Sequence, residues 1–285
     1  MPHQLRVAHS PDSDDAFMFW ALATDRIDTG DRRYTHELAD IESLNRRALK
    51  AELEITAVSF HAYAHLSDRY ALLPHGGSIG DRYGPRVVAR DPTPPDPREA
   101  LRGRRVAIPG ELTTAYLALQ MYQPDFEPVV VPFDAIERAV SGGDVDAGLL
   151  IHEGQLTYAR QGLALWTDLG EWWHGETGLP LPLGCNVVRR DLGPELIRNV
   201  SRDLRMSITH GLAHRTEALA YAMQFARGLT PSDADTFVGM YVNDFTVDYG
   251  PRGRAGVRAL LDRAAAAGLI PSGFEIVFVD DEASL

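Results

Sequence analysis

The chain has 285 residues, of which 45% are hydrophobic and 24% charged, as in ordinary globular proteins of one large or two modest domains. A formal net charge of −12 argues against nucleic acids and anionic membrane surfaces as partners, because phosphate binding depends on Lys and Arg. The single cysteine, Cys185, excludes a disulfide framework and a cysteine-rich metal site. It stands in the apolar run LPLGCNVVRR, which predicts an inert core thiol.

The N-terminal sequence has no basic region followed by a long apolar stretch, so we expect no signal peptide. No window of the chain approaches the roughly 18 apolar residues that a transmembrane helix requires. We therefore expect a cytoplasmic protein.

Strand-like and helical segments alternate along the first part of the chain. Residues 5–9 form a predicted strand, followed by the polar turn SPDSDD and a buried helix over AFMFWALATDRI. A second strand is predicted at 54–60, followed by the helix-like segment HAYAHLSDRYALL, and a third strand at 86–90. The proline-rich DPTPPDPREAL that comes next is typical of a surface connection.

The alternation continues in the middle of the chain. Strands are predicted at 104–110, in VVVPF and at 147–151, with helices over TTAYLALQMY and AIERAVSGGDV between them. A further strand is predicted in CNVVRRDL, and the remainder is mainly helical. Alternation of this kind predicts an α/β fold with mostly parallel sheets covered on both faces.

The order of the predicted elements divides the chain into two lobes. We expect lobe one to comprise residues 1–88 and 187–285 and lobe two to comprise residues 89–186. The chain would then cross between the lobes twice, near 86–90 and near 184–189.

Four segments that follow predicted strands carry polar residues that could converge. They are residues 10–15, Ser59, residues 111–115 and residues 152–154. In open α/β sheets, ligands bind outside the carboxyl ends of the strands. Thr113 and Thr114 can cap a helix whose remaining N–H groups hold a carboxylate, although an N-cap without a ligand is the more usual explanation of such a pair.

The segment from Ser10 to Asp15 is open to the same two interpretations, since Ser and Asp are ordinary helix caps. Its three carboxylates would repel an anionic ligand unless they point away. A metal site is a weaker interpretation of Asp-x-Asp-Asp, because no matching histidine cluster lies nearby, and we expect none.

His152 ends an apolar strand, which is a position from which a side chain reaches a crevice. Its reference pKa near 6.5 suits proton abstraction at neutral pH. A structural histidine remains the alternative. His61, His65, His75 and His174 lie in helical or loop contexts without this feature. The adjacent Trp172 and Trp173 could stack on an aromatic ligand, but lobe packing is the more usual role of paired aromatics.

Several blocks in order along the chain resemble the 1,4-dihydroxy-6-naphthoate synthase family of the futalosine route to menaquinone. The blocks are HSPDSDDAFMFWAL, DIESLNRRAL, TAVSFHAYAHLSDRYALL, GGSIGDRYGPRVVAR, VAIPGELTTAYLAL, DAGLLIHEGQLTY, DLGEWWHGETGLPLPLG and YVNDFTVDYG, and they extend from about Leu5 to Gly250.

The resemblance implies a two-lobed fold similar to type-2 periplasmic binding proteins, with the ligand between the lobes. It implies a carbon–carbon lyase that splits cyclic dehypoxanthine futalosine, a small anionic aromatic substrate, into 1,4-dihydroxy-6-naphthoate and dihydroxyacetone without a metal or organic cofactor. His152 would be the catalytic residue. Substrate contacts would fall to Ala57, Val58 and Ser59, to Thr113, Thr114 and Ala115, and to Ser10 and Asp14.

The first block departs from the pattern of many members, which read S-P-C-P-N-D where this chain has S-P-D-S-D-D, so that Asp14 replaces an amide. This departure leaves the substrate within the family open. Two alternatives also remain. One is the sister enzyme chorismate dehydratase, and the other is a non-catalytic binding module for a small carboxylate.

Overall fold

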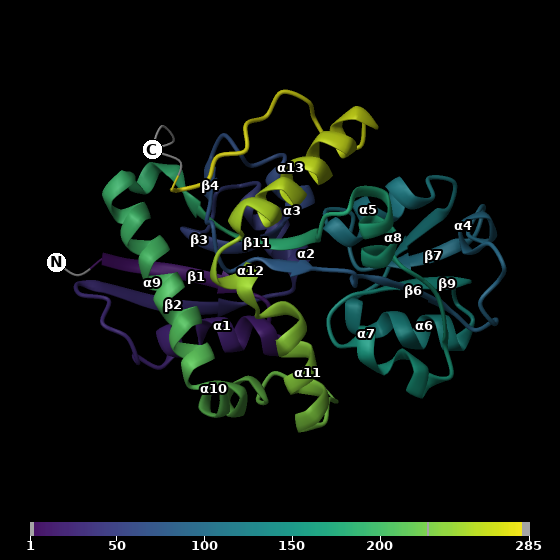
Figure 1. The fold of residues 1–285 in the computed structure, drawn as a ribbon, viewed down its shortest axis with the longest axis horizontal. Coiled ribbons are helices and arrows are strands. Elements are labelled where there is room, and N and C mark those ends of the chain that lie inside the picture. The colour runs from purple at the N-terminus through teal and green to yellow at the C-terminus, as the bar shows by residue number, and fades with distance from the viewer. Residues whose placement is uncertain (1–2, 227, 281–285) are drawn as a thin grey trace.

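The structure is a computed structural model that describes residues 3–226 and 228–280, and it contains two β-sheets placed side by side along the long axis of the molecule (Figure 1). We call the first sheet with its helices lobe one and the second sheet with its helices lobe two.

Lobe one holds a mixed sheet with the strand order β2-β1-β3-β11-β4, and β5 also pairs with β11. Its strands are β1 (His3–His9), β2 (Arg32–Leu38), β3 (Ile55–Ser59), β4 (Tyr70–Leu72), β5 (Ser78–Gly80) and β11 (Leu181–Arg189). Its helices are α1 (Ser13–Ala23), α2 (Ile41–Ala48), α3 (Phe60–Tyr63), α9 (Pro194–Ala213), α10 (Arg215–Ala222), α11 (Pro231–Tyr241), α12 (Asp244–Val247) and α13 (Gly250–Ala266).

Lobe two holds a sheet with the strand order β10-β6-β9-β7-β8. Its strands are β6 (Arg86–Ala89), β7 (Arg105–Ile108), β8 (Glu127–Val130), β9 (Ala147–Leu150) and β10 (Ala164–Asp168). Its helices are α4 (Pro97–Ala100), α5 (Thr114–Tyr122), α6 (Ile136–Gly142), α7 (Gly154–Thr157) and α8 (Leu169–Thr177). Short 3-10 turns lie at Phe133–Ala135, Tyr158–Gln161 and Arg190–Leu192.

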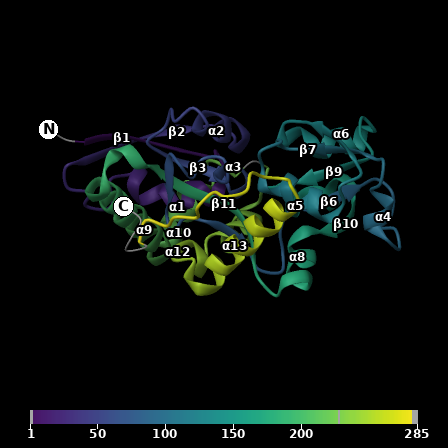
Figure 2. The same cartoon turned by 90° about the horizontal axis from the view of Figure 1, so that it is seen from above.

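Helix α1 is apolar around its whole circumference because it is covered on every side. From Ser13 to Leu22 each residue is buried. The helix packs against α9, α10 and α11, and Figure 2 shows α9 and α10 on one side of the strands β1 and β2. A helix that is apolar on all sides is typical of a protein interior, whereas a helix at the surface is amphipathic. It brings the polar loop at its N-terminus, residues 10–12, to a fixed place at the end of β1.

The prediction of mostly parallel sheets is wrong for five of the nine strand pairings. β1 is parallel to β2 and β3, and β7 is parallel to β8 and β9. β6 runs antiparallel to β9 and β10, and β11 runs antiparallel to β3, β4 and β5. The reason is the double crossing, because β6 and β11 are the strands by which the chain enters each sheet from the other lobe.

The two passages between the sheets lie a few residues before the expected positions. The first falls between β5 and β6, at 81–85, and the second between β10 and β11, at 169–180. The expected positions, 86–90 and 184–189, fall largely within strands β6 and β11, which pair along one sheet each. The segment HAYAHLSDRYALL is a four-residue helix followed by β4, because buried Tyr70 and Leu72 pair with β11. Strands β2, β5 and β10 and helices α2 and α8 were not predicted.

The two passages touch one another at Gly170. A Cβ added there would lie 2.0 Å from the backbone carbonyl of Tyr83. We expect Gly170→Ala to lower the free energy of unfolding by about 1–3 kcal/mol, because rigid backbone on the facing segment cannot yield. Gly175→Ala is the control in the same helix, since its Cβ would meet no atom within 4 Å. Urea unfolding of both variants measures the difference, and equal stability would show that the contact is unimportant.

No helix in residues 3–226 and 228–280 combines the length and apolarity needed to cross a bilayer.

Candidate functional site

A cavity with about 680 Å³ of empty volume lies between the two sheets. Every residue that the sequence predicted as part of the site lines it: Ser10, Asp14, Ala57, Val58, Ser59, Thr113, Thr114, Ala115 and His152. The lining residues include no lysine and no arginine. Four strands explain the convergence, because β1 and β3 in lobe one and β7 and β9 in lobe two all end at this cleft.

His152 reaches the cavity through an unusual backbone conformation. Strand β9 ends at Leu150, and His152 has φ +52°, in the left-handed region that histidine seldom occupies. Backbone strain of this kind persists where the surroundings enforce it, and it is often found at functional sites. The turn directs the imidazole across the cleft toward lobe one.

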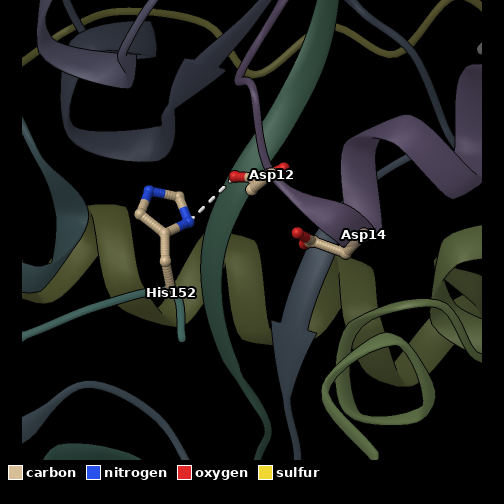
Figure 3. A group of neighbouring side chains, drawn as sticks. All are labelled: Asp12, Asp14 and His152. Carbon is tan, nitrogen blue, oxygen red and sulfur yellow. Dashed lines mark ion pairs between the residues drawn. The ribbon is translucent and has the colours of Figure 1, made fainter. Parts of the chain in front are cut away.

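The imidazole contacts a carboxylate from the other lobe. Nδ1 of His152 lies 2.9 Å from Oδ2 of Asp12, the residue that caps α1, and Figure 3 shows the second ring nitrogen turned away from this contact. No described residue forms a hydrogen bond with that nitrogen, Nε2. It is therefore the ring atom that remains available to a ligand.

The surroundings favour the charged forms of both partners. Burial disfavours the imidazolium, but the charge and hydrogen bond of Asp12 outweigh it and raise the pKa of His152 above 6.5. Burial likewise opposes ionisation of Asp12, yet the pairing with His152 lowers the pKa of this carboxyl below 3.8. The opposite shift is found at His9, His36, His61, His65, His75 and His210, whose pKa values burial lowers. His152 thus differs from these six histidines.

Asp14 and Asp15 lie beside this pair, and their pKa values are shifted in the opposite direction to that of Asp12. Burial first, and then the negative charge of Asp12, raise the pKa of both carboxyls well above 3.8. Both are therefore favoured in the neutral form, which removes much of the repulsion that three carboxylates would exert on an anionic ligand. Oδ1 of Asp14 is buried without a hydrogen-bond partner among the described residues, and Figure 3 places the Asp14 carboxyl on the same side as Asp12 and His152.

The opposite wall of the cavity carries the start of helix α5. The hydroxyl of Thr113 accepts a hydrogen bond from the N–H of Tyr116, as an N-cap does, while Thr114 donates its hydroxyl hydrogen to the carbonyl of Leu183. Within the described residues, the N–H groups of Thr114 and Ala115 have no acceptor. Free N–H groups at the positive end of a nine-residue helix form a place where a carboxylate can bind.

Ser59 is held in place by hydrogen bonds to Asn45, a residue that the sequence analysis did not single out. Asn45 of α2 accepts a hydrogen bond from the N–H of Ser59 at 2.9 Å, and its amide donates to Oγ of Ser59 at 3.2 Å. The same amide donates to the carbonyl of Leu112 in lobe two at 3.3 Å. Asn45 therefore links the two ligand-facing loops, and only the helix α2 that follows β2 brings it there.

Asp12, Asp14 and His152 each offer one potential metal-ligand atom, and these atoms lie within 4.8 Å of one another. The direct 2.9 Å contact between His152 and Asp12 is a hydrogen-bonding distance. A tetrahedral zinc ion at about 2.1 Å from each atom would hold them about 3.4 Å apart. The 2.9 Å contact is that of an ion pair, and it is shorter than the separation that a tetrahedral zinc ion would impose.

Two other sequence predictions concern the core. Cys185 lines the cavity but is 2% exposed, and burial raises the pKa of its thiol well above 9.0, so it is an inert thiol as predicted. Trp173 is fully buried and Trp172 packs beside it, which confirms the packing role of this pair.

The sequence missed further cavity residues, among them Asp12, Gln155 and Tyr241. Asp12 was grouped with the other acidic residues of its loop, and its contact with His152 depends on the approach of two lobes. Gln155 and Tyr241 join the lobes through a 2.8 Å hydrogen bond from the tyrosine hydroxyl. No local pattern in the sequence marks these residues, because their partners lie 86 residues or more apart in the chain.

Comparisons with known proteins agree with this architecture. The family model described as menaquinone biosynthesis matches residues 5–266. A protein of Thermus thermophilus named 1,4-dihydroxy-6-naphthoate synthase is 44% identical, covering 96% of this chain and 99% of its own. One of the same name from Streptomyces coelicolor is 40% identical, covering 94% and 95%.

Solved structures show the same fold. A protein from Archaeoglobus fulgidus has a TM-score of 0.89 at 48% identity and covers 94% of this chain and 99% of its own. The alkanesulfonate-binding protein of Xanthomonas axonopodis pv. citri has a TM-score of 0.70 at 14% identity and covers 98% and 96%. The second likeness concerns the fold alone and confirms the periplasmic-binding-protein-like architecture predicted from the sequence. The match over residues 5–266 and the identities of 40% and 44% over nearly the whole length show that this chain belongs to the menaquinone biosynthesis family.

Proposed function

We propose that the protein is a 1,4-dihydroxy-6-naphthoate synthase, a carbon–carbon lyase that splits cyclic dehypoxanthine futalosine into 1,4-dihydroxy-6-naphthoate and dihydroxyacetone. The observation that carries the proposal is the position of His152, whose free Nε2 enters a cleft that also contains the unoccupied N–H groups of α5. A module that only binds a carboxylate would need the N–H groups of α5, but it would have no need of the basic Nε2 of His152.

The two walls of the cavity suit the two ends of this substrate. The N–H groups of Thr114 and Ala115 would hold its carboxylate, since no lysine or arginine among the described residues lines the cavity. Asp14 has the shape of the asparagine found in many relatives, and its Oδ1, which has no hydrogen-bond partner among the described residues, can accept a hydrogen bond from a substrate hydroxyl. The departure from the family pattern at this position is then compatible with the same ligand.

In the proposed reaction, neutral His152 accepts a proton from the substrate. The electron pair that is released drives cleavage of the carbon–carbon bond, and formation of the aromatic naphthoate ring supplies driving force. The remaining contribution of the protein is to orient the scissile bond and to exclude water between the lobes. No step requires a metal ion or an organic cofactor.

The test is to incubate the purified protein with cyclic dehypoxanthine futalosine and, separately, with chorismate, and to determine product masses. We expect 1,4-dihydroxy-6-naphthoate and dihydroxyacetone from the first and no reaction with the second. Loss of water from chorismate would instead identify the dehydratase. Binding of either compound without turnover would identify a binding module.

A further inference from the structure

The partner of His152 comes from the other lobe. Asp12 lies in the loop between β1 and α1 of lobe one, whereas His152 follows β9 of lobe two. The chain separation of 140 residues means that no local structure holds the two side chains together. The contact exists only while the lobes are as close as they are in this structure.

Other contacts across the cleft maintain this closed arrangement. Arg160, which follows α7, pairs with Asp233 of α11 through two contacts of 2.8 Å. The hydroxyl of Tyr241, at the end of α11, donates to Oε1 of Gln155. Figure 1 shows α11 of lobe one next to α7 of lobe two. Asp12 and His152 therefore meet inside a cleft that is closed along one edge.

We propose that Asp12 is the positioning residue for His152, and that its carboxylate holds Nδ1–H of the imidazole so that Nε2 is the basic atom facing the substrate. An ionised carboxylate only accepts hydrogen bonds, so the neutral imidazole must carry its proton on Nδ1. This inference rests on the proposed function, in which His152 is the base. It assigns to Asp12 a role that acts through His152 and not on the substrate.

The neighbouring groups leave this role to Asp12 alone. Among the described residues no hydrogen bond joins Asp15 to the ring: its Oδ2 accepts the N–H of Ser10, and its own N–H donates to Oδ1 of Asp12. The charge of Glu153 also raises the pKa of His152, by less than the charge and hydrogen bond of Asp12 do. Phe133 packs edge-on against the imidazole, with ring centroids 4.9 Å apart. Asp14 acts on Asp12, through a side-chain hydrogen bond that lowers the pKa of Asp12.

Asp12→Asn separates positioning from folding. Asparagine caps a helix as well as aspartate does, so α1 keeps its N-cap while His152 loses the charged acceptor. We expect kcat to fall about 10²-fold, within the range for orientation of a catalytic histidine, with KM little changed. Asp40→Asn is the matched control, because Asp40 caps α2 in the same manner through Ser43 and lies outside the cavity.

The pH dependence distinguishes positioning from a general structural defect. The pKa of His152 is raised in the wild type, so kcat/KM should fall as the pH drops through a value above 6.5, where the imidazole becomes protonated. In Asp12→Asn, burial remains while the attraction is lost, and the acid limb should move to lower pH. If Asp12→Asn lost activity while the acid limb of its pH profile stayed in place, the proposal would be overturned. A kcat of Asp12→Asn equal to that of the wild type would also overturn it.

The titration of His152 by NMR, with ¹³C-labelled histidine, makes the test independent of turnover. We expect its midpoint to drop in Asp12→Asn and to stay in place in Asp40→Asn, with the His152 signal assigned from His152→Asn. An unchanged midpoint in Asp12→Asn would contradict the role of Asp12 even in an active enzyme. A wild type that makes no naphthoate but shows this drop would refute the proposed function while leaving the Asp12–His152 pairing established.

Discussion

His152→Asn is expected to bind the substrate and to lose about 10²–10⁴-fold in kcat, the usual contribution of a general base. Asparagine is the appropriate replacement because it tolerates the left-handed backbone at this position, with φ +52°, better than most residues do. The variant removes the basic nitrogen without imposing a new backbone strain. Steady-state kinetics and calorimetric titration of the substrate give the change in turnover and in affinity separately.

His174→Asn is the control for this experiment. His174 lies on α8, outside the cavity, with its Nδ1 3.7 Å from a carboxylate oxygen of Asp81. We expect its turnover to remain near that of the wild type. A His152→Asn protein with a normal melting temperature and near-wild-type kcat would remove His152 from the mechanism.

Asp203→Ala is expected to lower the free energy of unfolding by about 3–5 kcal/mol, the cost of leaving a buried charge without its partner. Asp203 of α9 is fully buried and binds Arg32 of β2 through two hydrogen bonds, of 2.6 and 3.2 Å. The hydroxyl of Tyr34 donates to the same carboxylate at 2.7 Å. The substitution leaves the guanidinium of Arg32, 7% exposed in its side chain, with only a 3.6 Å contact to the exposed carboxylate of Asp31.

Asp191→Ala provides the comparison, because Asp191 pairs with Arg189 at 2.6 Å while its side chain remains 65% exposed. An exposed ion pair contributes about 0–1 kcal/mol, so this variant should unfold near the wild-type urea concentration. Urea unfolding followed by circular dichroism measures both variants. Equal stability of the two would show that burial does not determine the strength of the Arg32–Asp203 pair.

The sequence alone was sufficient for the fold class and for grouping residues that line one cavity. Strands such as 5–9 and 147–151 are short apolar runs, each followed by polar residues, and this local pattern survives in the structure as β1 and β9. Because strand ends meet at one cleft in folds of this class, their positions in the sequence suffice to group Ser10, Ser59, Thr113 and His152. The catalytic and substrate-binding roles of these residues remain predictions.

The edge strands and crossings were less predictable, for a physical reason. Strand β4 has only three residues, and its pairing with β11 decides its conformation against a helix-like local sequence. The direction of β6 and β11 follows from the passage of the chain between lobes, which no local periodicity records. Tertiary pairing overrides local propensity most readily in such short segments.

The state of the acidic residues was decided only by the tertiary structure. In the sequence, Asp12, Asp14 and Asp15 are three equivalent carboxylates in one loop. In the folded chain, contact with His152 from the other lobe keeps Asp12 ionised, whereas burial beside that charge favours the neutral form of Asp14 and Asp15. Residue type and spacing are properties of the sequence, but desolvation and the approach of a charge 140 residues away arise only when the two lobes pack together.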